Sequence, residues 1–212
     1  EFFFKNNKNR IIINIGGISN ITYLPTNKNI IGFDCGPGNI LLDHWIRIQH
    51  NKNYDNLGRW AKSGELIEDL LLNFQKDLFF KKSPPKSTGR ELFNINWLNK
   101  FDVKNYPTED IQRTLLELTV VTINDSIKRF CPSVDEIYIC GGGSKNKFLI
   151  ERLKKITGLN IDTTDKLNMP SQQVEAIAFA WLAKKCIRKQ FNNSPTITGS
   201  SGPRILGAIH YS

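Results

Sequence analysis

The stretch RIIINIGGISNITYLPTNKNIIGFDCGPGN, residues 10–39, indicates the fold class of the chain. Three short apolar runs rich in β-branched residues occupy 10–15, 21–24 and 30–33, and glycine, proline and asparagine lie between them. Such runs, bounded by turn-forming residues, are typical of strands. Because the connections are short, we expect the three strands to form an antiparallel meander.

The pattern changes after residue 39, where apolar residues recur at helical spacing. Later apolar runs alternate with amphipathic segments. A meander followed by alternating helices and strands predicts an α/β fold with a mixed sheet flanked by helices. The expected elements are helices at 40–48, 66–74, 108–129, 145–157 and 171–189, and strands at 136–140 and 159–161.

Two of these helices carry more detailed predictions. Thr108 precedes two acidic residues and is predicted to be the N-cap of the long helix. In the last helix, Val174, Ile177, Ala178 and Trp181 share one face and are predicted to point inward.

Composition narrows the class of protein. The chain has 212 residues, of which 40% are hydrophobic, so one large domain or two small ones are expected. The net charge of +9 raises the alternative of a nucleic-acid partner. However, the basic residues are scattered and do not alternate with aromatic ones as in a strand-binding groove, so compositional drift is favoured and no nucleic acid is expected.

The sequence contains no apolar span long enough for a membrane helix, and we expect no membrane partner. The four cysteines, Cys35, Cys131, Cys140 and Cys186, form no C-x-x-C pair and do not suggest a disulfide framework. A reducing cytoplasm fits this spacing best, and a zinc site is not expected.

Glycine-rich turns follow three of the expected strands, at 16–17, 36–38 and 141–143. Glycine permits positive φ and close approach of a ligand, and backbone N–H groups in such turns can bind phosphate. A single turn of this kind is weak evidence, but three at the carboxyl ends of strands favour a nucleotide site. Neither a P-loop nor a strand–GxGxxG–helix motif is present.

Two carboxylates have alternative interpretations. Asp34 lies beside a glycine turn, where it is either a cap or a general base. The flanking glycines and Asn39 favour the base, because they are expected to cap the next helix and leave the acid free. Glu175 lies in the first turn of the last helix, where an acid also complements the helix dipole.

Several stretches together resemble the anhydro-N-acetylmuramic acid kinase family, and the resemblance covers residues 10–210. The most specific are GFDCGPGN (32–39), with Asp43 and Trp45 after it, and PKSTGRELFN (85–94). The others are NIGGISNITYLP (14–25), DNLGRWAKSG (55–64), IQRTLLELT (111–119), CGGGSKN (140–146), VEAIAFAWLA (174–183) and TGSSGPRILGAIH (198–210).

The resemblance implies an RNase H-like fold of the actin, Hsp70 and sugar kinase superfamily. It also implies a kinase that uses ATP and Mg²⁺ to convert 1,6-anhydro-N-acetylmuramic acid and water to N-acetylmuramic acid 6-phosphate in peptidoglycan recycling. By the same resemblance, Asp34 is the general base that activates water. The other implied site residues are Glu175 and Asn39 for the sugar, Asn14, Gly16 and Gly17 for phosphate, and Gly141, Gly142, Gly143 and Asn146 for the adenosine side. No metal ligand is implied in this chain.

The family's first phosphate loop, GTSxDG, is not found, so residues 1–212 are expected to be the C-terminal RNase H-like kinase domain, with a helical insertion at about 60–130 and without the N-terminal domain. The family is expected to be homodimeric and cytoplasmic. The alternative to an active kinase is a truncated, inactive remnant that still binds nucleotide. The segment from Lys86 to Arg90 has no assigned role, and Arg90 is open to pairing with a phosphate, the lactyl carboxylate or Glu91.

Overall fold

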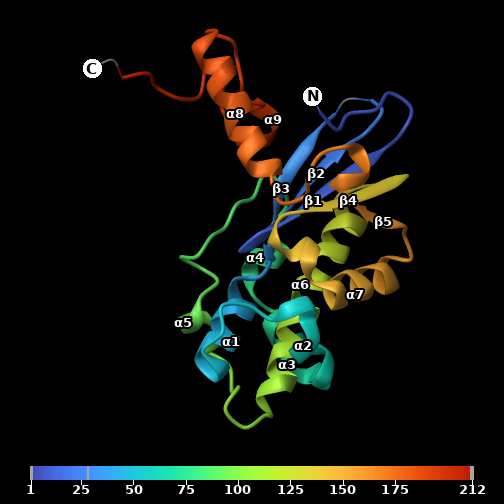
Figure 1. Cartoon of the computed structure of the whole chain (residues 1–212), viewed down its shortest axis with the longest axis vertical. Coiled ribbons are helices and arrows are strands. Elements are labelled where there is room, and N and C mark those ends of the chain that lie inside the picture. Colours follow the sequence, from blue (N-terminus) through green and yellow to red (C-terminus); the bar gives the residue numbers. More distant parts are fainter. Residues whose placement is uncertain (1, 28, 211–212) are drawn as a thin grey trace.

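The computed structural model describes residues 2–27 and 29–210, and its centre is one mixed sheet (Figure 1). The strand order is β3-β2-β1-β4-β5, with the first three strands antiparallel and β4 and β5 parallel to β1. The predicted meander and the α/β class with a mixed sheet are therefore confirmed. The strands are β1 (Arg10–Ile15), β2 (Ile18–Leu24), β3 (Ile31–Pro37), β4 (Glu136–Cys140) and β5 (Ile161–Thr163).

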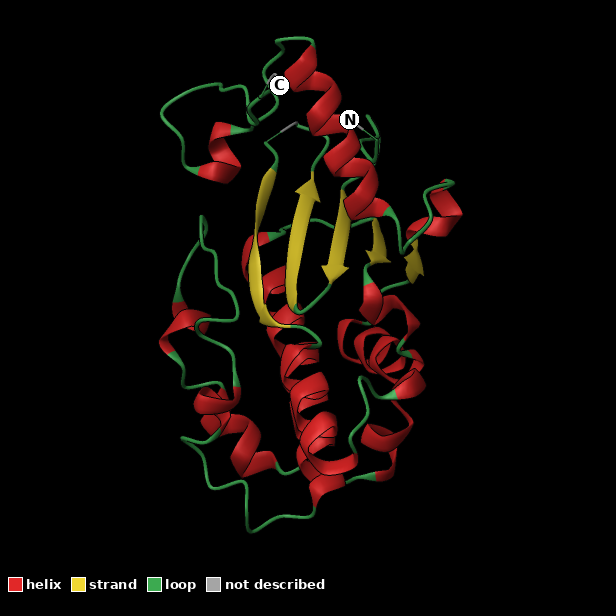
Figure 2. Cartoon of the chain, turned by 60° about the vertical axis from the view of Figure 1, so that its left-hand side comes forward, coloured by secondary structure: helices red, strands yellow, loops and turns green. Residues whose placement is uncertain are grey.

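Helices fill the connections, and those between β3 and β4 extend well beyond the sheet (Figure 2). The helices are α1 (Ile40–His50), α2 (Arg59–Ser63), α3 (Glu68–Phe74), α4 (Leu78–Lys81), α5 (Ile95–Leu98), α6 (Thr108–Phe130), α7 (Lys147–Thr157), α8 (Val174–Ile187) and α9 (Pro195–Thr198). Three 3₁₀ turns are η1 (Asn56–Gly58), η2 (Gly142–Lys145) and η3 (Thr164–Leu167). No helix within the described residues is both long and apolar enough to cross a membrane.

The two faces of the sheet are packed differently. Alternation along β1 places Ile11, Ile13 and Ile15, all 0% exposed, in the main core with α6 and α7. The opposite face carries a smaller apolar cluster, in which Ile12, Leu24 and Cys140 are buried. Five half-buried apolar residues pack against them: Phe3, Phe4, Ile30, Tyr138 and Val174. That second face is the one from which polar side chains of the meander project.

Several predicted boundaries were wrong at the strand ends. β3 continues to Pro37, so Asp34 lies inside a strand and does not follow one. A bulge lies within this extension: Asn20 pairs with Asp34 and Ser19 pairs with Gly36, which leaves Cys35 between them. β2 likewise begins three residues before its expected start at residue 21. β5 lies two residues later in the chain than the strand expected at 159–161.

The predicted N-cap of the long helix was also wrong. Pro107 occupies the cap position and Thr108 is the first helical residue, so the Thr108 hydroxyl caps nothing. The acids in the first turn are present as predicted, at Glu109 and Asp110.

Helix α8 does not pack as predicted. It extends away from the sheet (Figure 1), and none of its residues is buried. Val174, Ile177 and Trp181 are only half-buried and Ala178 is exposed, although the helix is apolar on most sides. Such a helix usually packs against another surface on several sides.

Candidate functional site

The glycine turns meet around the end of β1. The carbonyl oxygens of Gly16 and Gly17, in the β1–β2 hairpin, accept hydrogen bonds from the N–H groups of Asn39 and Gly38, both at 2.8 Å. Ile40 N–H also donates to the Gly17 oxygen, at 3.1 Å. The N–H groups of Gly38, Asn39 and Ile40, just before and at the start of α1, therefore bind the hairpin and are not free to cradle a phosphate.

The third glycine turn packs against the same strand end. Gly141 has φ of +82°, and a Cβ there would overlap the Asn14 side chain. A Cβ on Gly143 would overlap the Ile15 side chain. Close backbone packing therefore explains two of these glycines without a ligand. At Gly142 a Cβ would meet only the Asn39 amide nitrogen, at 3.7 Å, so this position is open.

Asp34 belongs to a polar row that crosses the exposed sheet face. Asp34 pairs with Asn20 of β2, and Asn20 pairs with Asn14 of β1. Directly opposed residues of neighbouring strands project from the same face, so the three side chains lie in sequence from the sheet edge inward.

The Asp34 carboxylate is not free, contrary to expectation. Its Oδ2 accepts hydrogen bonds from Ser87 Oγ at 3.0 Å and from Thr88 N–H at 2.9 Å. The Asp34 N–H in turn donates to the Lys86 carbonyl oxygen at 3.1 Å. The segment from Lys86 to Thr88 thus holds the carboxylate from one side, and no described residue donates to Oδ1.

Asn39 also differs from its prediction. It occupies the N-cap position of α1 but makes no side-chain cap hydrogen bond. Its Nδ2 instead donates to the Ile15 carbonyl oxygen at 3.2 Å, which ties α1 to the end of β1.

One hollow, of about 350 Å³, lies on the exposed sheet face; we call it the Glu175 hollow. Its polar lining comes from Asn14, Asn20, Thr22 and Glu175. It therefore brings together two residues predicted for the site, and Asn20 connects it to Asp34 through strand pairing.

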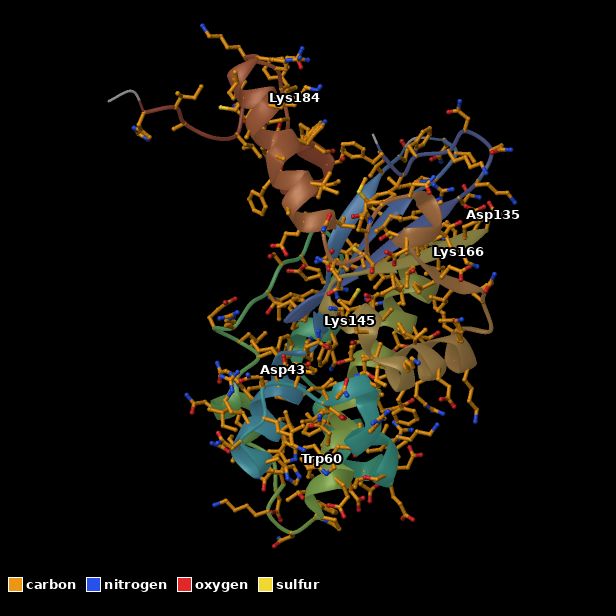
Figure 3. The ribbon with its side chains drawn as sticks, viewed as in Figure 1. Asp43, Trp60, Asp135, Lys145, Lys166 and Lys184 are labelled. Carbon is orange, nitrogen blue, oxygen red and sulfur yellow. The ribbon has the colours of Figure 1, made fainter. Side chains whose placement is uncertain are left out.

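A second hollow, of about 590 Å³, lies beyond the ends of β1 and β4; we call it the Gly142 hollow. Gly142, Asn146 and Asn39 line it, so Asn39 lies with residues predicted for the adenosine side and not with Glu175. Asp43 of α1 and Lys145 of η2 also line it; both are labelled in Figure 3.

The polar residues that line the Gly142 hollow differ in their surroundings and in their hydrogen-bond partners. Burial raises the pKa of Asp43 to about 6, although Arg47 acts to lower it. Asp55 accepts the N–H groups of Trp60 and Ala61 and holds the start of α2. Asn146 caps α7 through its Oδ1, which accepts the Leu149 N–H at 3.0 Å, so its position in the lining has a structural explanation as well.

Asn20, Asp43, Ser87 and Thr88 were missed as candidates from the sequence. Asn20 could have been predicted, because it is a polar residue on the outward-facing side of an alternating strand. The Ser87 and Thr88 contacts join segments more than fifty positions apart, and no local pattern predicts such contacts.

The described residues contain no group of three or more His, Cys, Asp or Glu side chains that could hold a metal ion. Mg²⁺ is commonly held by one or two carboxylates together with substrate phosphates and water. A shared site of this kind needs fewer protein carboxylates than a site made by the protein alone.

Comparisons with known proteins agree with the motifs. The model of the family described as anhydro-N-acetylmuramic acid kinase matches residues 1–212. The anhydro-N-acetylmuramic acid kinase of Nitrosomonas europaea is 47% identical over 99% of this chain and 58% of its own length. The protein of that name from Pseudomonas syringae pv. syringae is 45% identical over 99% of this chain and 59% of its own.

The fold also occurs in a solved structure. The activator of 2-hydroxyisocaproyl-CoA dehydratase from Clostridium difficile, solved with ADPNP bound, superposes with a TM-score of 0.50. It is 18% identical, and the match covers 89% of this chain and 66% of that one. This likeness concerns the fold alone.

Proposed function

The chain belongs to the anhydro-N-acetylmuramic acid kinase family, and we propose that it supplies the general base and much of the nucleotide site of such a kinase. The reaction consumes ATP, water and 1,6-anhydro-N-acetylmuramic acid and yields ADP and N-acetylmuramic acid 6-phosphate. The chain spans about 58% of the length of the curated relatives it matches, so the activity is proposed for the protein that contains it.

In this proposal Asp34 is the base. Ser87 and Thr88 fix the carboxylate through Oδ2, which leaves Oδ1 to accept a proton from water. As the proton moves, the water oxygen bonds to the anomeric carbon and the bond from that carbon to O6 breaks. O6 then bonds to the γ-phosphorus, and ADP leaves.

The Glu175 hollow is the proposed position of the sugar. Glu175 accepts hydrogen bonds from sugar hydroxyls there, and Asn14 and Asn20 donate or accept along the polar row that leads to Asp34. Asn39 is proposed for the sugar by resemblance, but the Gly142 hollow that it lines favours a role nearer the nucleotide.

ATP is proposed to place its adenosine end in the Gly142 hollow, near Gly141, Gly143 and Asn146, and its phosphates near the hairpin of Gly16 and Gly17. A Mg²⁺ ion brought with ATP would offset the charge of the phosphates during transfer. The protein's own part is to position the phosphates through these turns.

The observation that carries the proposal is the polar row of Asp34, Asn20 and Asn14, which leads from the bound carboxylate to the strand end where the glycine turns meet. The test is ATP-dependent phosphorylation of 1,6-anhydro-N-acetylmuramic acid by this chain, alone and supplemented with the part of a relative's chain that it does not match. Product in the supplemented assay supports the proposal. Nucleotide binding without product in either assay would instead support the inactive remnant.

A further inference from the structure

Lys86 is a buried lysine whose ammonium lacks an acidic partner. The residue is 8% exposed, and its Nζ lies 4.8 Å from the Phe79 ring centroid and 5.8 Å from that of Phe33. No ion pair or hydrogen bond joins Nζ to any described residue. The two ring faces give the ammonium cation–π contacts, and Asp34 acts on it electrostatically from further away. Buried lysines are normally paired with an acid, and without a salt bridge Nζ can donate hydrogen bonds to a ligand.

The side chain borders a hollow of about 500 Å³ on the helix-covered side of β3, between α4 and the C-terminal end of α6. Three further cations line the hollow: Lys81, Lys128 and Arg129. Asp125 is its one acidic lining residue among those described. Arg129 donates to the carbonyl oxygens of Phe80 and Lys81, which fixes the guanidinium without neutralising it.

The floor of the hollow adds hydroxyl groups. Thr122 and Ser126 are buried side chains of α6 that line it beside Cys35. The Thr122 hydroxyl donates to the Thr119 carbonyl oxygen at 3.2 Å and Ser126 is hydrogen-bonded to Cys35, so the donors for a ligand are the ammonium and guanidinium groups. Such groups suit the oxygens of a phosphate group, which accepts several hydrogen bonds at once.

We propose that this hollow, defined by Lys81, Lys86, Lys128, Arg129, Thr122 and Ser126, is a binding site for a small phosphate-bearing anion, separate from the glycine-turn site. Lys86 anchors the anion from within, and the exposed cations at the rim attract it. The site lies behind Asp34, because the backbone of Lys86 receives the Asp34 N–H while its side chain extends into the hollow.

The probe is inorganic phosphate, titrated into the ¹⁵N-labelled chain and followed by amide NMR, with sodium chloride at matched ionic strength as reference. We expect phosphate, and not chloride, to shift the amide signals of Thr122 and Ser126. Lys86→Met keeps the apolar stem between the rings and removes the charge. It is expected to weaken phosphate binding about tenfold or more, the usual scale for losing a charged hydrogen bond.

The matched control is Lys104→Met, which makes the same charge change four residues before α6, at the opposite end of a helix about 34 Å long. Lys128→Met changes an exposed cation of the rim and should weaken binding severalfold even if Lys86→Met folds poorly. Equal binding by Lys86→Met and Lys104→Met, or shifts confined to residues 141–146, would overturn the proposal.

A second titration with glucose 6-phosphate identifies the source of the phosphate group. Equal affinities indicate a site for free phosphate, and tighter binding of the ester indicates a sugar phosphate. Both readouts measure binding and not turnover, so they succeed or fail independently of the proposed kinase activity.

Discussion

Asp34 Oδ2 accepts a hydrogen bond from the Thr88 backbone N–H, 2.9 Å away, and this contact joins the strand β3 to the loop that follows α4. Because a backbone donor cannot be removed by substituting a side chain, the carboxylate keeps this anchor in most variants. The contact gives the segment PKSTGRE a role that the sequence alone left open: it orients the proposed base.

Asp34→Asn should lower kcat by about 10²–10⁴-fold, the usual contribution of general-base catalysis. The amide retains the acceptor toward Thr88 but cannot take a proton from water. The measurement is steady-state turnover in the supplemented assay, and Asp69→Asn on the exposed surface of α3 is the control. Turnover of Asp34→Asn within threefold of the control would exclude Asp34 as the base.

Local sequence patterns were sufficient to predict the strands of the sheet but not where every strand ends. Alternating and β-branched runs marked β1 and β4 to the residue, because each is a buried central strand. The end of β3 was missed because glycine and proline at 36–37 indicated a turn, whereas pairing with β2 extends the strand through them.

The site was predictable in its parts but not in its connections. Glycine turns could be recognised locally, and the structure shows that they meet around β1. That Ser87 reaches Asp34, or that Asn39 lies with Gly142, depends on tertiary packing. The inward packing predicted for α8 was wrong, because an apolar pattern indicates that a helix packs against some surface but does not identify that surface.

The Glu175 hollow and the Gly142 hollow should respond to different substitutions. Glu175→Gln is expected to lower kcat/KM for the sugar by about 10–100-fold through the loss of a charged hydrogen bond, with the Kd for ATP unchanged. Gly142→Leu should do the reverse, since the side chain would enter the Gly142 hollow. Calorimetric titration with ATP and kinetics with varied sugar separate the effects; a shared loss of both in each variant would contradict the assignment.

Gly141→Ala is expected to destabilise the fold more than Gly158→Ala. Both glycines have positive φ, but Gly158 (φ 67°, ψ 8°) lies in the left-handed helical region, where alanine costs about 1 kcal/mol. Gly141 (φ 82°, ψ 177°) lies in a region that is essentially restricted to glycine, so the backbone penalty is larger there. A Cβ at 158 meets nothing within 4 Å, whereas one at 141 would overlap Asn14. Urea unfolding should show an additional loss of at least about 1–2 kcal/mol for Gly141→Ala. Equal losses would show that the turn at 141 relaxes away from β1.

Asp43→Asn should stabilise the protein at neutral pH. Burial raises the folded-state pKa of Asp43 to about 6, above its ordinary value of 3.8. Its stabilising contribution is therefore present below about pH 4 and is lost as pH rises through 6. We expect the free energy of unfolding of Asp43→Asn, relative to that of the wild type, to be about 1–3 kcal/mol higher at pH 7 than at pH 4. Urea unfolding at both pH values measures it. No change in the difference between pH 4 and pH 7 would mean that the carboxylate is well solvated.

Glu117 has the opposite pH dependence. Burial acts to raise its pKa, but hydrogen bonds from Arg152 and Arg113 outweigh burial and hold the pKa below its ordinary value of 4.5. Glu117 is 3% exposed, and its carboxylate accepts hydrogen bonds from Arg113 Nη1 at 2.6 Å and Arg152 Nη2 at 2.8 Å, so it joins α6 to α7. The stability it contributes is present above pH 4.5 and is lost as pH falls through the lower folded-state pKa.

Glu117→Gln leaves two guanidinium groups without a counter-charge and should cost about 3–5 kcal/mol at pH 7, with a smaller cost at pH 3. Glu151→Gln, in the exposed pair with Lys62, is the matched control and should cost less than about 1 kcal/mol at either pH. Thermal or urea unfolding at the two pH values measures both. A cost for Glu117→Gln that is independent of pH would show that shape, and not charge, holds α6 against α7.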